Sequence, residues 1–296
     1  MLTKINPYNR TDARIYASNY LGIYKSNPVG NYESNPTMKT ICINSNKGGA
    51  AKSTSSVNLA FNLRRRGFRV LLVDCDSQLG NSSFLVNKSK VTPNLGLVMM
   101  DYAPIQDAIS VADSSWLGLS VIAGGEENLV AEIKLAHEVG NQLILKSKLE
   151  QVQDQYDWCV IDTPPTKSLI VLNALMAADY LIVPVAVGVL DFAGIAGIME
   201  LFAKVQQRGN PNLRLMGILL TRWLKNKLAK DFEKQIRGLF PNLVFQSVIP
   251  EGVAIGNSHA NKMPVISCFP ESAGAIAYQN FTNEVINHEN KVRLAS

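Results

Sequence analysis

Apolar and polar positions alternate with two different periods along residues 38–296. Short aliphatic runs predict strands at 38–44, 69–73, 119–123, 158–161, 180–185, 215–220 and 243–248. Between most of these runs apolar residues recur at helical spacing, which predicts helices over 53–66, 126–153, 168–178, 191–208, 228–238 and 272–288. Aliphatic strands that alternate with helices indicate an α/β fold, with a mostly parallel, doubly wound sheet flanked by helices.

Residues 1–37 show neither period. This segment holds six Asn and five of the nine Tyr of the chain, and three prolines interrupt it. We interpret it as an irregular N-terminal arm, because 37 residues without a regular apolar pattern are too few for a core of their own. No linker or repeat divides residues 38–296, which predicts a single α/β domain there.

Composition narrows the class of protein. Apolar residues make up 47% of the 296 residues, and we find no apolar run near the roughly 18 residues of a spanning helix. With no secretory signal at the start, we expect a cytoplasmic protein that does not enter membranes. The net charge of +5 is compatible with nucleic acid or another anionic ligand. The four cysteines lack CxxC spacing, so we expect reduced thiols at Cys42, Cys75, Cys159 and Cys268.

The most informative stretch, NKGGAAKST at 46–54, lies between the first strand and the first helix. Backbone N–H groups at the start of a helix favour anions, which predicts a phosphate-binding loop. We expect Lys52 to neutralise β- and γ-phosphate charge and the Ser53 hydroxyl to ligate Mg²⁺. Asn46 and Ala51 break the strict pattern G-x-x-x-x-G-K-[ST], which leaves a tight turn before a helix cap as the alternative. The expected nucleotide-binding residues of the loop are Lys47, Gly48, Gly49, Ala50, Ala51, Lys52, Ser53 and Thr54.

Carboxylates stand at the ends of two predicted strands. Asp74 and Asp76 follow the run at 69–73, and Asp162 follows the run at 158–161. Carboxyl ends of parallel strands meet at one sheet edge, so we expect these side chains near the phosphate loop. A carboxylate there can hold Mg²⁺ through a bound water, because Mg²⁺ keeps much of its hydration shell. An isolated aspartate at a strand end is otherwise a cap or a turn residue.

Taken together, these segments resemble the ParA/MinD family, and within it the ParA/Soj-type partition ATPases. The match covers about residues 38–288 and places the chain among the P-loop NTPases of the deviant Walker A type. The matching motifs are KGGxGK[ST] at 47–53, hhhhDxDPQGN at 70–81 with Ser77 for Pro and Leu79 inserted, YDxhhhDTPP at 156–165, and NALxAADxhhhPh at 173–185. Shorter fits occur at 217–221, 248–250 and 262–265.

The resemblance implies an ATPase with ATP and Mg²⁺ as cofactors. Lys47 would reach across a homodimer to the partner's nucleotide, and Asp76 would orient or activate the attacking water. Pro250 would lie near the adenine. The implied catalytic residues are Lys47, Lys52 and Asp76. The implied metal-site residues are Ser53, Asp74 and Asp162.

The resemblance further implies an ATP-dependent homodimer, non-specific DNA binding and a ParB-like activator, with plasmid or chromosome segregation as the family's role.

The candidate DNA-binding segment is 222–237, where six basic and two acidic residues give a net charge of +4. A solvated helix face is the alternative. Glu251 and Ala254 replace arginines that the family associates with DNA. The expected DNA-binding residues are Arg222, Lys225, Lys227, Lys230 and Lys234, and DNA binding would make the protein nucleoid-associated.

Three alternatives remain open. A MinD-like protein would need an amphipathic C-terminal helix on lipid, but Val292 and Leu294 are the only apolar anchors of the last ten residues. A positioning protein acting on another matrix, or a metabolic P-loop enzyme such as an ATP-dependent carboxylate ligase, would keep the same loop.

Ala51 bears on how fast the protein hydrolyses ATP. If the loop requires a positive φ at this position, alanine is less favourable there than glycine by about 1 kcal/mol, and we expect weak hydrolysis.

Overall fold

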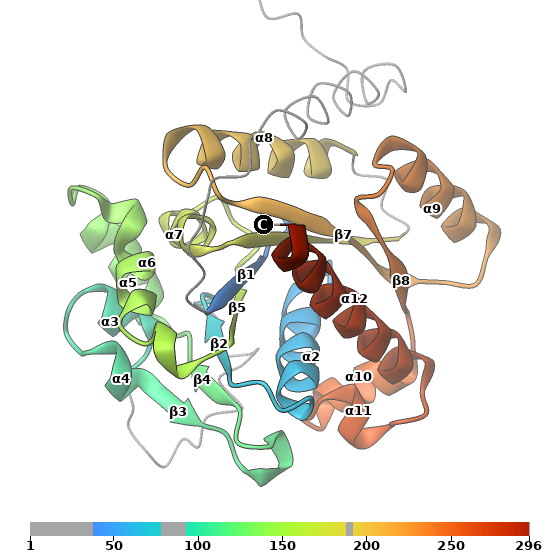
Figure 1. The fold of residues 1–296 in the computed structure, drawn as a ribbon, viewed down its shortest axis with the longest axis horizontal. Helices are drawn as coiled ribbons and strands as arrows, with labels where there is room; N and C mark the ends of the chain where they lie inside the picture. Colours follow the sequence, from blue (N-terminus) through green and yellow to red (C-terminus); the bar gives the residue numbers. More distant parts are fainter. Residues whose placement is uncertain (1–37, 78–92, 188–191, 296) are drawn as a thin grey trace, which may run out of the picture.

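The sheet is built as the sequence predicts, with strands covered on both faces. The structure, a computed structural model, describes residues 38–77, 93–187 and 192–295, so the N-terminal arm lies outside the described residues. The described strands form one sheet in the order β3-β4-β2-β5-β1-β6-β7-β8, and among these neighbours β3–β4 alone is antiparallel (Figure 1). Their bounds are β1 Lys39–Ile43, β2 Val70–Asp74, β3 Ile109–Val111, β4 Ser120–Ile122, β5 Trp158–Asp162, β6 Tyr180–Ala186, β7 Arg214–Trp223 and β8 Val244–Pro250.

Helices cover both faces of this sheet and enclose two apolar cores. Alternate residues of β1 serve different cores, because Ile41 and Ile43 pack with α2 and α12 while Cys42 packs with α7 and α8. The helices are α2 Lys52–Arg65, α3 Leu95–Met99, α4 Ile105–Ala108, α5 Glu127–Leu135, α6 Ile144–Glu150, α7 Leu169–Ala177, α8 Phe192–Arg208, α9 Lys227–Leu239, α10 Val253–Ala260, α11 Val265–Cys268 and α12 Ala273–Ala295. Within the described ranges, no helix combines the length and apolar character needed to cross a bilayer.

One predicted helix is wrong in its extent. The single helix expected over 126–153 is divided into α5 and α6. Gly140 adopts a left-handed φ of 73° between them, a conformation that interrupts a right-handed helix. The side-chain amide of Asn141 then donates to the carbonyls of Leu135 and Ala136, which satisfies the end of α5.

The strand register fixes where the chemistry lies. Asp162 is in register with Ile43 on one side and with Asp74 on the other. The carboxyl ends of β1, β5 and β2 therefore meet along one edge, as predicted. The loop after β1 enters α2 at this same edge.

Packing of α12 on β8 offers a direct test of this fold. Phe281 of α12 is fully buried, and its ring packs edge to face on Phe245, with 5.0 Å between ring centroids. We expect Phe281→Ala to lower the free energy of unfolding by about 3–5 kcal/mol in urea titrations. Ile276→Ala is the control on the same helix, because Ile276 is 48% exposed and should change stability by about 0.5 kcal/mol. Equal losses in both variants would contradict the packing of α12.

Candidate functional site

The loop that joins β1 to α2 has the backbone shape of a phosphate cradle. Gly49 and Ala51 both lie in the left-handed region, with φ of 75° and 59°. Ala51 immediately precedes α2 and has no side-chain oxygen to cap the helix, so the first N–H groups of α2 remain available to an anion. The positive φ that the sequence analysis considers for Ala51 is therefore present. Because a left-handed φ costs alanine about 1–2 kcal/mol, the backbone is strained at this residue.

Lys52 folds back over this loop. Its side chain is buried, with the residue only 7% exposed, and Nζ donates to the carbonyl of Lys47 at 3.2 Å. Burial lowers the pKa of Lys52, and the negative charges of Asp162 and Asp76 oppose that shift. A desolvated ammonium held at the start of a helix is placed to neutralise a bound phosphate.

Two buried carboxylates face the loop from the neighbouring strands. Asp74 and Asp162 are at most 1% exposed and pair in register. Burial raises the pKa of Asp162 to about 7, and the charge of Asp74 adds to this shift. Hydrogen bonds from Ser53 and Ser56 and the charge of Lys52 act in the opposite direction, and the Ser56 Oγ lies 3.0 Å from Asp162 Oδ1.

This donor set fits Mg²⁺. Carboxylate and hydroxyl oxygens are the ligands that Mg²⁺ prefers, and a dication would relieve the repulsion between Asp74 and Asp162. Ser53, Asp74 and Asp162 are the residues that would hold it. The described ranges contain no group of three or more His, Cys, Asp or Glu that could bind a metal ion by itself. Phosphate oxygens would complete the coordination, since Mg²⁺ commonly binds through one or two carboxylates plus substrate phosphates.

Asp76 lies two residues after Asp74, just past the carboxyl end of β2, and is partly buried. Its backbone N–H donates to Asp74 Oδ1 at 2.9 Å, and its carbonyl accepts from the side-chain amide of Asn128 at 3.2 Å. The backbone of Gly124 also approaches closely, because a Cβ at that position would lie 2.1 Å from the Asp76 carbonyl oxygen. The backbone of Asp76 is thus held by contacts with Asp74, Gly124 and Asn128.

The ends of β7 and β8 close the opposite side of the loop. The Thr221 hydroxyl donates to the carbonyl of Ala50 at 3.1 Å. Arg222 donates through Nε to Glu251 Oε2 at 2.8 Å, and its Nη1 lies 3.6 Å from where a Cβ of Gly49 would stand. Pro250 ends β8 beside this pair. Arg222 therefore belongs to the rim of the loop and is paired with Glu251, one of the two residues that replace arginines associated with DNA in the family that the sequence resembles.

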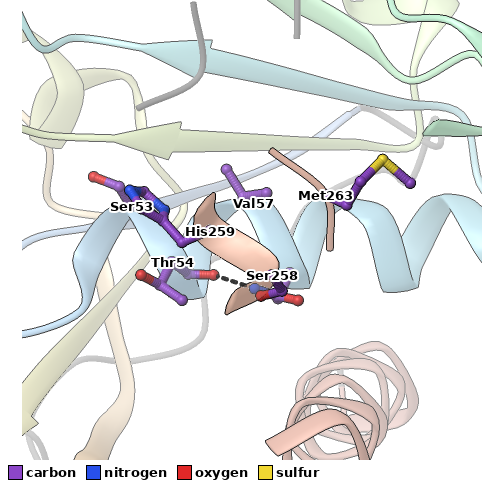
Figure 2. A pocket seen from close by; sticks show the side chains of 7 residues that line it. Ser53, Thr54, Val57, Ser258, His259 and Met263 are labelled. Carbon is purple, nitrogen blue, oxygen red and sulfur yellow. Dashed lines mark hydrogen bonds between the residues drawn. The ribbon is translucent and has the colours of Figure 1, made fainter. Parts of the chain in front are cut away.

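A small cavity opens beside the first turn of α2. Figure 2 shows His259 of α10 close to Ser53 and Thr54, with Ser258 on the same side. Asn58 links α2 to the start of α11. Its side-chain amide donates to the Thr54 carbonyl at 2.8 Å, and its Oδ1 accepts from the Val265 N–H at 3.0 Å. The cavity lining consists of Ser53, Thr54, Val57, Asn58, Ser258, His259 and Met263.

The remaining expected DNA-binding residues lie elsewhere. Lys225, Lys227, Lys230 and Lys234 are exposed on α9 or just before it, while Phe232 and Ile236 face the core. Arg237 is turned inward, where it pairs with Glu233 and donates to carbonyls of β8. The structure thus brings the loop and the three aspartates together and separates them from the α9 lysines.

Sequence reasoning missed several residues of this site. Ser56 lies one helical turn after Lys52, a spacing that places both on the same face of α2. That spacing could have identified Ser56. Thr221 and Asn128 act through contacts between distant segments, for which the sequence carries no local signal.

The raised pKa of Asp162 makes stability depend on pH in the protein free of nucleotide and metal. The folded chain holds this proton up to about pH 7, whereas an aspartate in solution releases it near 3.8. The contribution to folding is therefore complete below pH 4 and is lost as pH rises through 7. We expect Asp162→Asn to remove this decline, measured by urea unfolding between pH 4 and 8. Asp231→Asn, an exposed control on α9, should follow the wild type, and a wild-type decline that persists in Asp162→Asn would refute the assignment.

Comparison with known proteins identifies the family of this chain. A family model described as an AAA domain matches residues 38–215. The sporulation initiation inhibitor protein Soj of Bacillus subtilis is 32% identical over 249 residues, which cover 83% of this chain and 98% of Soj. The chromosome partitioning protein ParA of Myxococcus xanthus is 28% identical over 253 residues, covering 85% and 89%. The structure of cobyrinic acid a,c-diamide synthase from Mycobacterium smegmatis with ADP and magnesium aligns with a TM-score of 0.74 at 26% identity, covering 86% of this chain and 96% of that one. The chain belongs to the ParA/MinD family of P-loop partition ATPases.

Proposed function

We propose that this protein is an ATP-dependent switch that positions a cargo by binding non-specific DNA in its ATP-bound, dimeric state. The observation that carries the proposal is the juxtaposition of a strained, uncapped loop with the buried Lys52 and the paired Asp74 and Asp162. Such a site pairs anion-binding groups with oxygen ligands for a cation. ATP with Mg²⁺ fits both parts of the site, because its phosphates are negatively charged and its bound Mg²⁺ is positively charged.

Each residue of the site takes one task in this proposal. N–H groups of the first turn of α2 and the ammonium of Lys52 bind phosphate oxygens. Ser53, Asp74 and Asp162 hold Mg²⁺, which when bound neutralises charge that develops on the phosphates. Asp76, fixed by Asn128 and Gly124, orients the attacking water.

Lys47 distinguishes a switch from an ordinary P-loop enzyme. It lies at the start of the loop, where its carbonyl accepts a hydrogen bond from Lys52 Nζ. We assign it to the phosphates of a second copy in an ATP-bound homodimer. A ParB-like protein would accelerate hydrolysis and return the protein to its monomeric state. The partition proteins named among its relatives support DNA as cargo or matrix.

A metabolic role is the second candidate, favoured by the similarity to cobyrinic acid a,c-diamide synthase. Such an enzyme would activate a carboxylate with ATP and would not require Lys47. The two proposals separate in one assay, because a switch hydrolyses ATP in response to DNA or an activator, whereas a ligase requires its carboxylate substrate.

The exposed lysines near α9 generate the prediction on DNA. Reversing Lys225, Lys227 and Lys230 to Glu together should weaken ATP-dependent binding to non-specific duplex at least tenfold at low salt, because phosphate contacts supply non-specific affinity. The slope of log affinity against log salt should fall by about one for each phosphate that a lysine no longer neutralises. The measurement is fluorescence anisotropy of a labelled duplex across a salt series.

A charge-matched control is available for this experiment. Lys146, Lys204 and Lys291 are exposed on other helices, so their reversal to Glu changes net charge equally without touching α9. The control should bind duplex better than the α9 variant. Undiminished binding by the α9 variant would remove the proposed DNA surface.

Strain at Ala51 generates a prediction on turnover. We expect slow steady-state phosphate release by the wild type and an increase of about fivefold in Ala51→Gly, because closing the loop on the transition state costs about 1 kcal/mol more with alanine than with glycine at this position. Ala50→Gly is the matched control, because Ala50 is outside the left-handed region. A fast wild type that the glycine at 51 leaves unchanged would refute weak hydrolysis.

A further inference from the structure

Asn128 interrupts the apolar face that α5 turns toward the protein interior. The buried residues of this helix, Asn128, Ala131 and Leu135, follow helical spacing and so lie on one side of it. Apolar side chains are usual at such positions, because burial of a polar side chain is unfavourable unless its groups are paired. Asn128 is nevertheless only 1% exposed. A specific partner must therefore account for an amide at this position.

The partner of Asn128 is the backbone of Asp76. Asn128 Nδ2 donates to the Asp76 carbonyl at 3.2 Å, between residues 52 positions apart in the sequence. Within the described ranges, Asn128 Oδ1 is buried without a hydrogen-bond partner, so the side chain uses only its donor end. An unpaired buried acceptor is unfavourable, and an aliphatic side chain of similar size would avoid it. Stability alone therefore does not explain why asparagine stands here.

The peptide groups on both sides of the Asp76 Cα are restrained. The Asp76 N–H donates to Asp74 Oδ1 at 2.9 Å, and the Asp76 carbonyl accepts from Asn128. Each residue has only two freely rotating backbone bonds, and these determine the direction in which its side chain leaves the backbone. Restraint of both peptide groups thus restrains the direction of the Asp76 side chain. One restraint comes from an aspartate of the expected metal site, and the other comes from α5.

The start and the middle of α5 are themselves held in place. Just before the helix, a Cβ on Gly124 would lie 2.1 Å from the Asp76 carbonyl oxygen, so the chain here approaches Asp76 as closely as glycine allows. In the middle of α5, Glu132 Oε1 accepts from the N–H of Ile170 at 3.0 Å, in the first turn of α7. Asn128 lies between these two contacts, so its amide reaches Asp76 from a fixed position.

We propose that Asn128 is a positioning residue for ATP hydrolysis and acts through Asp76. The proposal rests on the role of Asp76 in the proposed function. There Asp76 orients a water in line with the terminal phosphate, and a displacement of about 1 Å in such a group can slow a reaction a hundredfold. Because the hydrogen bond of Asn128 goes to Asp76 rather than to the phosphate loop, its loss should slow hydrolysis and leave ATP affinity unchanged.

Asn128→Leu tests this assignment, because leucine has a similar size and no hydrogen-bond donor. In single-turnover hydrolysis of ATP with Mg²⁺ and protein in excess, we expect the rate to fall at least tenfold. The dissociation constant for a non-hydrolysable ATP analogue should change less than twofold, and the midpoint of urea unfolding should not fall below that of the wild type. Asn128→Ala is a second variant without the donor and should lose rate to the same extent, with circular dichroism establishing that both are folded.

Asn62→Leu is the matched control. Asn62 is fully buried on α2, its Nδ2 donates to the Asn58 carbonyl at 2.9 Å, and its Oδ1 has no partner within the part of the chain that the structure describes. It lies ten residues after Lys52, which places it about 15 Å along the helix from the nucleotide edge. Its substitution removes the same kind of hydrogen bond far from Asp76, so the hydrolysis rate should equal that of the wild type.

The outcomes separate this inference from the proposed function. Wild-type hydrolysis that Asn128→Leu retains overturns the inference alone. A fall in rate with an equal loss of affinity for the analogue, or the same fall in Asn62→Leu, assigns Asn128 to the folding of the site and also overturns it. A wild type that hydrolyses no ATP in a single turnover overturns the role of Asp76 in the proposed function, and this inference with it.

Discussion

The structure depends on the burial of opposite charges at one sheet edge. Parallel β2 and β5 place Asp74 and Asp162 in register, and the loop after β1 brings the buried Lys52 to the same point. Burying carboxylates together is unfavourable unless a cation or a proton compensates them, which is why the pKa of Asp162 rises to about 7. The chain thus maintains a site that a cation and phosphate groups would stabilise. Affinity for both is a consequence of the strand register, and any rearrangement of β1, β2 or β5 would abolish it.

Contacts around this edge keep its geometry fixed. Ser56 from α2 and Asn128 from α5 bind Asp162 and Asp76, while Thr221 at the end of β7 holds the loop carbonyl of Ala50. Each of these hydrogen bonds joins segments that are distant in the sequence, so the site forms only when the whole sheet is assembled. The strain at Ala51 persists because these surrounding contacts determine the loop conformation.

Much of this arrangement could be predicted because its signals are local. Continuous aliphatic runs identify β1, β2 and β5, and the aspartates that follow them identify the nucleotide edge. Short elements such as β3 and α10 were missed, because three to eight residues show too little periodicity. The break at Gly140 was missed because a single glycine within an apolar period can also be tolerated in a helix. Arg222 shows a different limit: its charge suggested DNA, but its pairing with Glu251 follows from the adjacency of β7 and β8.

The central claim is that two copies close over two nucleotides. The most direct measurement is a crystal structure of the protein with a non-hydrolysable ATP analogue and Mg²⁺. The account predicts a two-fold dimer in which the ammonium of Lys47 contacts phosphates bound to the partner, with Mg²⁺ beside Ser53 and Asp162. A monomer with the analogue bound and Lys47 in solvent would contradict it.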